Sequence, residues 1–152
     1  MQIPDTKLKV LVVDDMVTYR AILTQVLKEF DWIEVSGTAS NGKNALEAMH
    51  KNTADLVLID LEMPVLTGLE AVPLLRQQFP NSQVVLISGT NKNSADLTLL
   101  ALEAGALDFI PKPNQDSLSA NREELRQRLK AVTMTCLENL KRQGRQYSRV
   151  SP

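Results

Sequence analysis

Three carboxylates follow two short apolar segments of this sequence. The segment 10–13 leads directly into Asp14 and Asp15, and the segment 56–59 leads into Asp60. Runs of four residues rich in branched side chains are too short for a helix and are typical of buried strands. If these strands are neighbours in one sheet, the carboxylates lie close together and repel one another by several kcal/mol in a partly dry pocket. The pattern therefore requires positive charge at this place.

A hard divalent cation and a lysine are the two candidates for that charge. Carboxylate oxygens in a pocket open to water suit Mg²⁺, which takes about six oxygen ligands and usually keeps several waters. Zinc and copper are disfavoured because His50 is the only histidine and Cys136 the only cysteine. A single aspartate after a strand more often caps the next helix, but a pair together with Asp60 favours a metal site. The candidate lysine is Lys112, which lies between two prolines.

Asp60 has two chemical interpretations. As a third metal ligand it would belong to a passive cation site. As a nucleophile it would accept a phosphoryl group and form an acyl phosphate, for which nearby positive charge supplies the electrostatics. Lys112 suits the second interpretation, and a solvated surface lysine is its alternative. Ser88, at the end of a further apolar segment, is either a turn residue or a hydroxyl that donates to a phosphoryl oxygen.

Five short apolar segments alternate with stretches of helical period along the chain. The spacing predicts strands at 9–13, 33–39, 56–60, 83–87 and 108–111. It predicts helices around 19–30, from 42 to about 49 with Asn41 as the cap, at 69–78 and at 96–104. Pro73 is tolerated only near a helix start, so the helix 69–78 is expected to begin late or to bend.

Strands that alternate with helices over short connections specify a parallel sheet with helices on both faces. We therefore predict an α/β fold, a doubly wound three-layer α/β/α sandwich of flavodoxin-like type, with a five-stranded parallel sheet in the order 2-1-3-4-5. This order makes strands one and three neighbours. It brings Asp14, Asp15 and Asp60 together at the switch point of the sheet, where open α/β folds bind their ligands.

The composition is that of one domain without a membrane segment. Its 152 residues suffice for a full-sized core and a short appendage. The 17 basic and 18 acidic side chains disfavour a general nucleic-acid or membrane surface. The single cysteine excludes a disulfide framework, no apolar run is long enough to cross a bilayer, and residues 1–5 lack the features of a signal peptide. We therefore expect a cytoplasmic protein.

The spaced residues of the site resemble the receiver domain of two-component response regulators. The resemblance rests on Asp14-Asp15, on Asp60 followed by Met63-Pro64 and Gly68, on Ser88 and on Lys112-Pro113. It covers residues 7–113 and, with the last helix, extends to about residue 130. The segments 60–71 and 104–113 are further similar to the receiver of chemotaxis protein-glutamate methylesterases. The resemblance implies a function in two-component signal transduction, with chemotaxis as the setting that these segments suggest.

In that family's pattern Asp60 would be the phosphoacceptor, fed by a sensor histidine kinase or a phosphotransfer protein. Asp15 would bind Mg²⁺ directly, Asp14 would act partly through water, and the Leu61 carbonyl would be another ligand. Lys112 would pair with the phosphoryl group. Such a group brings about −1.5 to −2 charges and three strong acceptors, so it selects one arrangement of the elements around it.

The resemblance also implies a switch and two tuning positions. Ser88 would move towards the phosphoryl group, and Phe109 occupies the switch-aromatic position, from which it turns inwards when Ser88 moves. A core phenylalanine is the simpler interpretation of Phe109. Glu62 and Thr90 lie where family members tune the access of water to the acyl phosphate.

The last part of the chain differs from the rest in composition. Residues 114–120 are polar and expected to be irregular, and the apolar spacing over 121–143 predicts a long helix. The second half of this helix is either a partner or dimer surface or a simple continuation. The basic stretch 144–152 is expected to be a linker or a disordered tail, which makes residues 1–140 the receiver domain.

The sequence has no segment that matches an output domain. It contains no Gly-x-Ser-x-Gly nucleophile elbow, it leaves no room for a methylesterase domain, and no helix-turn-helix can be fitted. We therefore expect no enzyme activity beyond self-catalysed phosphoryl transfer and dephosphorylation. The chain is then either a receiver cut from a longer protein or a stand-alone receiver. In both cases it acts on a downstream effector domain or protein, and a homodimer is left open.

Three other functions compete with this interpretation. A phosphohydrolase with Asp60 as nucleophile and Glu62 as acid or base would be expected to carry a second aspartate where Glu62 stands. A flavodoxin-like cofactor binder would have a phosphate-binding loop of glycine and hydroxyl residues in place of Asp14 and Asp15. An interaction module that is never phosphorylated is the third alternative, and incubation with a small phosphodonor separates it from a receiver.

Overall fold

The computed structural model describes residues 7–89, 92–113 and 120–150, with side chains described as far as residue 144. The strands are β1 (Leu8–Val13), β2 (Ile33–Ala39), β3 (Leu56–Asp60), β4 (Gln83–Ser88) and β5 (Asp108–Pro111). The helices are α1 (Val17–Leu27), α2 (Gly42–Lys51), α3 (Gly68–Gln78), α4 (Lys92–Glu103) and α5 (Arg122–Val150). The strands are parallel and form one sheet in the order β2-β1-β3-β4-β5. The predicted fold class and strand order are confirmed.

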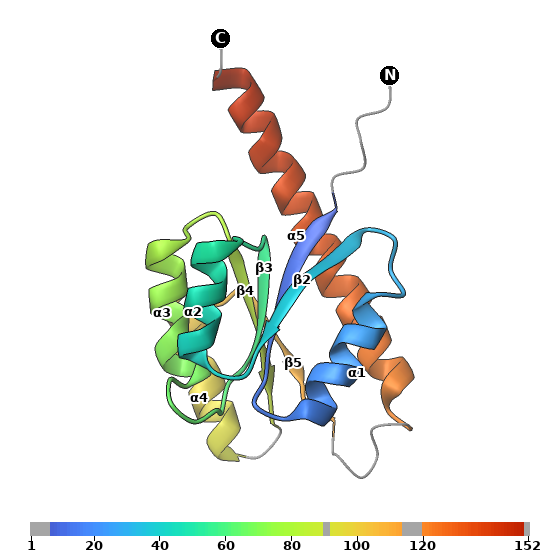
Figure 1. Ribbon diagram of the computed structural model, residues 1–152, viewed down its shortest axis with the longest axis vertical. Helices are drawn as coiled ribbons and strands as arrows, with labels where there is room; N and C mark the ends of the chain where they lie inside the picture. The colour runs from blue at the N-terminus through green and yellow to red at the C-terminus, as the bar shows by residue number, and fades with distance from the viewer. Residues whose placement is uncertain (1–6, 90–91, 114–119, 151–152) are drawn as a thin grey trace.

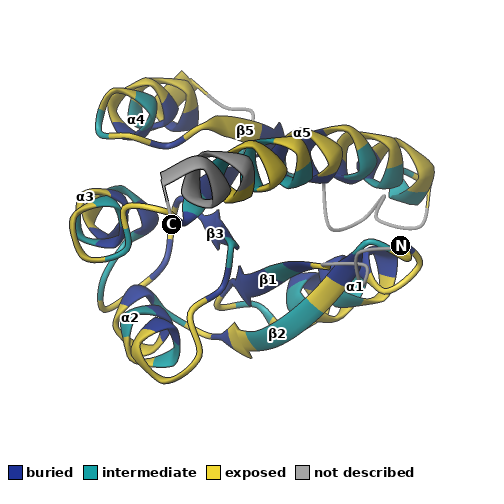
Figure 2. Ribbon diagram, turned by 90° about the horizontal axis from the view of Figure 1, so that it is seen from above, coloured by how far each residue is buried: buried dark blue, intermediate teal, exposed yellow. Residues whose placement is uncertain are grey.

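Helices cover both faces of this sheet (Figure 1). α1 and α5 lie on one face, and α2, α3 and α4 lie on the other. Alternate residues of a central strand enter opposite cores: Leu56 and Leu58 of β3 pack with α1 and α5, whereas Val57 and Ile59 pack with α2, α3 and α4. Figure 2 shows the resulting pattern, with buried sheet residues between half-buried helices. The near-continuous apolar character of β3 follows from burial on both faces.

Side-chain caps set the start of two helices on the second face. Asn41 accepts a hydrogen bond from the Asn44 N–H at 2.8 Å and caps α2, as predicted. Thr67 and Glu70 form a reciprocal capping box at the start of α3. Because this box begins the helix at Gly68, Pro73 lies within α3, and the expectation of a late start is wrong.

The helix α4 begins at Lys92, four residues before the predicted start. Asn93 and Ser94 have low intrinsic helix propensity, so sequence spacing gave no sign of this first turn. The face of α4 that packs against the rest of the molecule carries Ser94, Thr98 and Ala101. Two of these three residues are polar, which weakened the apolar period there.

The helix α5 is longer than predicted and passes beyond the end of the sheet where the strands begin (Figure 1). It reaches Val150 instead of ending at residue 143, so the expectation of an irregular chain from 144 is wrong that far. A glycine inside a helix costs only about 1 kcal/mol, and Gly144 does not end α5. The predicted irregular connection 114–120 lies outside the described residues except for residue 120.

Contacts along its length hold α5 to the domain. The Trp32 indole N–H donates to the Thr133 hydroxyl at 3.1 Å, and the Gln83 amide donates to the Cys136 carbonyl at 3.1 Å. Asn139 donates in turn to Gln83 at 2.8 Å. In the part of the chain that the structure describes, neither α5 nor another helix is long and apolar enough to cross a membrane.

Candidate functional site

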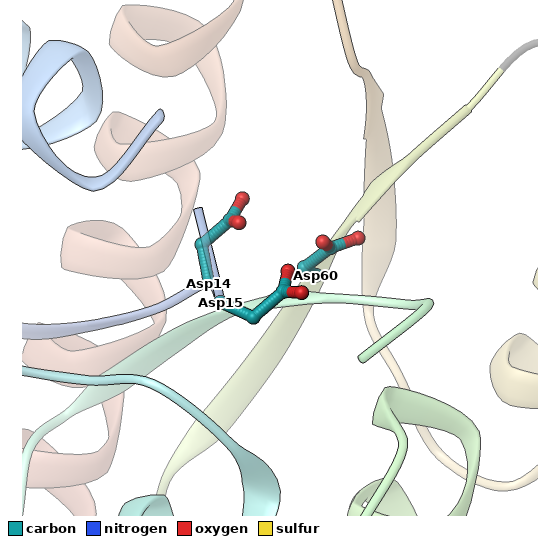
Figure 3. Close-up of side chains that lie close together, drawn as sticks. All are labelled: Asp14, Asp15 and Asp60. Atoms are coloured by element: carbon teal, nitrogen blue, oxygen red, sulfur yellow. The ribbon is translucent and has the colours of Figure 1, made fainter. Parts of the chain in front are cut away.

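Three carboxylates meet at the carboxyl edge of the two central strands (Figure 3). Asp14 and Asp15 follow β1, and Asp60 is the last residue of β3, which pairs with β1. Each carboxylate offers an oxygen, and these oxygens all lie within 4.8 Å of one another. Asp14 and Asp60 are buried, whereas Asp15 is exposed. The sheet order thus brings together the three acids that the sequence analysis selected.

Lys112, the predicted positive partner, lies against two of these acids. Its Nζ is 2.8 Å from Asp60 Oδ2 and 3.2 Å from Asp14 Oδ2. The lysine side chain is only 15% exposed. The Lys112 N–H donates to the Ser88 carbonyl, which continues the pairing of β4 with β5 and holds the lysine at the edge of the sheet.

Burial dominates the electrostatics of this cluster. It raises the pKa of Asp60 to about 6, against the hydrogen bond from Lys112, and the neighbouring charge of Asp14 adds to the increase. Burial also raises the pKa of Asp14, although the Met16 N–H and Lys112 oppose it. For Lys112 burial alone would lower the pKa, but Asp60 and Asp14 outweigh it and raise the pKa. The ammonium is therefore charged at neutral pH. The charged forms that burial disfavours are those of the two carboxylates.

The donor set fits a hard divalent cation. Asp14 Oδ2 is buried and accepts no hydrogen bond, and the Lys112 ammonium lies 3.2 Å from it. A buried carboxylate oxygen without a hydrogen bond is costly unless a cation satisfies it. Asp15 adds an exposed carboxylate beside it, and all these ligand atoms are oxygens. The described residues of this site can therefore hold a metal of the magnesium type.

The Leu61 carbonyl, which the resemblance implied as a further ligand, has another partner in this structure. It accepts the Gly68 N–H at 3.0 Å. Gly68 is required at this approach, because a Cβ there would lie 2.4 Å from the Asp60 carbonyl oxygen. A carbonyl oxygen has a second lone pair, so Leu61 as a ligand stays a prediction.

Ser88 turns towards α4 instead of towards Asp60. Its hydroxyl lies 2.6 Å from the Thr98 hydroxyl and 3.2 Å from the Gly89 carbonyl. Thr98 donates its own proton to the Ser94 carbonyl at 2.6 Å, so Ser88 is the donor in the Ser88–Thr98 pair. Sequence reasoning missed Thr98, although a threonine on the buried side of a leucine-rich helix was a usable signal.

The remaining predicted residues lie around this centre. The Glu62 N–H donates to Asp60 Oδ1 at 3.2 Å, and the Glu62 carboxylate accepts the Ser94 hydroxyl at 3.3 Å. Phe109 is 43% exposed, so its interpretation as a core phenylalanine is wrong for this structure. Thr90 lies outside the described residues.

Tyr19 is a site residue that the sequence analysis placed only at the start of the predicted helix 19–30. The Lys112 Nζ lies 4.1 Å from the centre of its ring, and its hydroxyl donates to the Pro113 carbonyl. The side chain is 5% exposed. Its position five residues after Asp14, in the first turn of α1, was the signal that could have placed it beside the strand end.

The loop between β3 and α3 contains a strained residue. Val65 has φ 73°, a left-handed conformation that is unfavourable for a β-branched side chain, and it is 74% exposed. The next residue, Leu66, accepts the Gly42 N–H at 3.1 Å, which fastens the loop to the start of α2. Strain in such a loop is typical of functional sites.

These features define a flavodoxin-like α/β domain with an acidic site, able to hold a cation, at the switch point of its sheet. Residues 10–130 match the response regulator receiver domain, and the chain belongs to that family. It is 40% identical over 128 residues to a protein-glutamate methylesterase/protein-glutamine glutaminase of Desulfotalea psychrophila, a match that covers 84% of this chain and 35% of the relative. A protein of the same name from Pyrococcus horikoshii is 40% identical over 126 residues, covering 83% of this chain and 34% of the relative. The chain spans about a third of the length of these relatives.

Solved structures agree with the family assignment. The response regulator domain of Thermotoga maritima CheB has a TM-score of 0.76 and 31% sequence identity, covering 87% of this chain and 97% of that chain. The receiver domain of NtrX from Brucella abortus has a TM-score of 0.68 and 30% identity, covering 85% and 98%. The chain is therefore a receiver domain of the response regulator type, with similarity to the receivers of methylesterases.

Proposed function

We propose that this receiver is switched by phosphorylation of Asp60 in a reaction that requires Mg²⁺. The observation that carries the proposal is the pairing of a buried carboxylate at the edge of β3 with an ammonium at 2.8 Å, beside two further carboxylates. An acceptor carboxylate needs positive charge around the incoming phosphoryl oxygens. Lys112 supplies part of it, and the acidic cluster can hold a cation that supplies the rest.

The proposed reaction transfers a phosphoryl group from a donor to Asp60. An Asp60 carboxylate oxygen forms a bond to phosphorus while the bond from phosphorus to the donor breaks, and the donor keeps that electron pair. When the donor is a phosphohistidine of a kinase or phosphotransfer protein, the released imidazole takes a proton from water. Lys112 then exchanges its hydrogen bond with Asp60 for one with a phosphoryl oxygen, at nearly the same position.

Asp14, Asp15 and Asp60 would hold the magnesium ion. When bound, this ion supplies positive charge to the phosphoryl oxygens. The chain's own residues orient the reaction: Lys112 keeps its ammonium between Asp60 and Asp14, and the Glu62 N–H holds the other Asp60 oxygen.

We further propose that Ser88 carries the switch. In this structure its hydroxyl donates to Thr98 of α4. A phosphoryl group on Asp60 offers three strong acceptors and competes for that proton, so modification would separate Ser88 from α4. The exposed ring of Phe109 on β5 would then turn towards the space that Ser88 leaves. Glu62 and Thr90 would tune the loss of the phosphoryl group.

The partners follow from this role. A sensor histidine kinase or phosphotransfer protein would supply the phosphoryl group, and a downstream effector would respond to the changed surface. Since the chain spans about a third of its relatives, we propose that residues 1–140 form the receiver and that the segment from 144 connects it to an effector domain in a longer protein. The receiver itself would have no activity beyond phosphoryl transfer and dephosphorylation, and chemotaxis would be the setting. Dimer formation stays a prediction.

Intact mass after incubation with acetyl phosphate tests the proposal. We expect the mass of one phosphoryl group to be added to the wild-type protein with Mg²⁺ and not with a chelator. Asp60→Asn should add none under either condition, and Asp55→Asn is the matched control because Asp55 lies at the other end of β3. Folded protein that binds Mg²⁺ but gains no mass would show an interaction module that is not phosphorylated.

A further inference from the structure

We infer that Tyr19 is a positioning residue for Lys112, and so sets how fast the site accepts a phosphoryl group. The inference rests on the proposed phosphorylation of Asp60 and adds a residue that the pattern of acids, serine and lysine does not contain. Tyr19 lies on α1, whereas Lys112 follows β5, so the contact joins two elements far apart in the sequence.

One aromatic side chain makes both of the contacts that carry this inference. The Lys112 ammonium lies 4.1 Å from the centre of the Tyr19 ring, a distance at which a cation is attracted to the face of the ring. The Tyr19 hydroxyl donates to the carbonyl of Pro113, the residue after Lys112. The ring thus holds the end of the lysine side chain while the hydroxyl holds the backbone of the next residue, Pro113.

The ammonium needs such a support because a lysine side chain is long and flexible. Fixing its rotatable bonds is entropically unfavourable, and its charge has three donors without a preferred direction. Asp60 and Asp14 contact the ammonium at 2.8 and 3.2 Å. During phosphoryl transfer the contact with Asp60 must change, whereas the contact with the Tyr19 ring can persist throughout.

Burial makes this contact effective. Tyr19 is 5% exposed and the Lys112 side chain 15% exposed, so little water competes for the ammonium on that side. A cation over an aromatic ring is stabilised more strongly when it is desolvated. Removing the ring would let the ammonium leave its position between the two acids, and phosphoryl transfer would slow even though every acid remained in place.

Rates of phosphorylation by acetyl phosphate with Mg²⁺ test the inference in three variants. Tyr19→Phe keeps the ring and should stay within about twofold of wild type, whereas Tyr19→Leu removes the ring and should be about three- to tenfold slower. Leu23→Val is the control for packing, since Leu23 is a buried residue of the same helix with neither a charge nor a ring. It should react at the wild-type rate.

A double-mutant cycle with Lys112→Ala separates positioning from a general structural effect. If Tyr19 acts through the lysine, Tyr19→Leu has no further effect on the rate, or on the affinity for beryllofluoride, in the Lys112→Ala protein. In the wild-type background, NMR signals of the Lys112 side chain should show a ring-current shift that Tyr19→Phe keeps and Tyr19→Leu loses.

The possible outcomes distinguish the two proposals. No phosphorylation of the wild type contradicts the proposed function itself. A wild type that reacts, together with a Tyr19→Leu protein of unchanged rate, overturns only the inference about Tyr19. An equal loss in both lysine backgrounds also overturns it, because Tyr19 would then act independently of Lys112.

Discussion

Two regions of this protein use ion pairs in opposite ways. At the acidic site, Lys112 pairs with Asp60 and Asp14 where all three side chains are at least mostly buried. The α1–α5 contact joins α5 to the connection that follows α1, and it comprises Glu29, Phe30, Trp32, Arg122, Arg126 and Thr133. Here the carboxylate of Glu29 pairs with both arginines at the surface. In the first region burial disfavours the charged form of the carboxylates. In the second region the charged groups are hydrated.

The pKa directions express this difference. Hydrogen bonding from Arg122 lowers the pKa of Glu29, so its charged form is favoured in the folded protein. Burial raises the pKa of Asp60 to about 6, so its charged form is disfavoured. The comparison indicates that the site is organised for a reaction at the expense of stability, whereas the α1–α5 contact only joins α5 to the connection after α1.

Removal of the lysine should give the largest change. Lys112→Met leaves the Asp14 and Asp60 carboxylates buried without a positive partner, and we expect the free energy of unfolding to fall by about 3 kcal/mol at neutral pH without Mg²⁺. Urea unfolding in the presence of a chelator measures it. The double variant Lys112→Met/Asp60→Asn is the control and should recover most of the loss. Unchanged stability in Lys112→Met would show that the cluster is hydrated and not destabilised by burial.

Removing the charge of Asp60 should raise the free energy of unfolding, which is the opposite of the effect expected for Lys112→Met. The pKa of Asp60 is about 6 in the folded protein against an ordinary value of 3.8, so folded protein holds the proton more tightly than unfolded protein does. The contribution of Asp60 to the free energy of unfolding therefore rises as the pH falls from about 7 to about 4. Asp60→Asn should remove this dependence and stabilise the metal-free protein by about 2 kcal/mol near pH 7.5.

Unfolding curves of Asp60→Asn and of wild type at several pH values give the difference between their free energies of unfolding. The direction in which this difference changes with pH checks the prediction. The gap in the free energy of unfolding between Asp60→Asn and wild type should narrow as the pH falls towards 4, because folded wild type is then protonated and the unfolded carboxyl, with an ordinary pKa of 3.8, begins to be protonated. Mg²⁺ should narrow the gap at neutral pH by binding the charged acids. A wild type that is the more stable protein at pH 7.5 without metal would contradict the assignment.

Relieving the backbone strain in the loop between β3 and α3 should change the free energy of unfolding less than the changes of charge at the site do. Val65→Gly relieves a positive φ of 73° that valine adopts unfavourably, and we expect a gain of about 1 kcal/mol. The same replacement at Val17, an equally exposed valine in the first turn of α1, should instead lower stability by a few tenths of a kcal/mol. Thermal unfolding of the pair measures the difference, and equal shifts would argue against strain in the loop.

The surface pair should give the smallest effect. Glu29→Gln removes the charge that Arg122 and Arg126 share, but all three groups remain accessible to water. We expect a change within the error of a urea unfolding measurement, and a smaller one still at high salt. A large loss would mean that the α1–α5 contact depends on charge instead of on the stacked rings of Phe30 and Trp32, which lie 4.8 Å apart.

The parts of the structure that follow from local spacing were predictable from sequence. The segments 33–39 and 108–111 became strands with those bounds, and strand order placed Asp14, Asp15 and Asp60 together. The missed features depend on contacts between distant segments. Local spacing places Tyr19 and Thr98 on their helices, but it does not indicate that Tyr19 meets Lys112, that Thr98 holds Ser88, or that Phe109 faces outwards.

The end points of helices were the other weakness. Caps and propensities compete there, so Asn93 and Ser94 in α4, and Gly144 in α5, pointed away from helices that nevertheless form. The capping box of Thr67 and Glu70 had a usable pattern and explains why α3 starts before Pro73.

Because α5 is long, a small tilt of this helix moves its far end by a larger distance. Gln83 bonds to Cys136 and Asn139 of α5, Leu140 still packs against the core, and from there the helix continues to Val150. At 1.5 Å per residue this last part is about 15 Å long, so a tilt of about 10° at the attachment displaces its tip by about 3 Å. A small rearrangement beside Asp60 would thus be enlarged at the opposite end of the domain, which is the direction in which the chain leaves it.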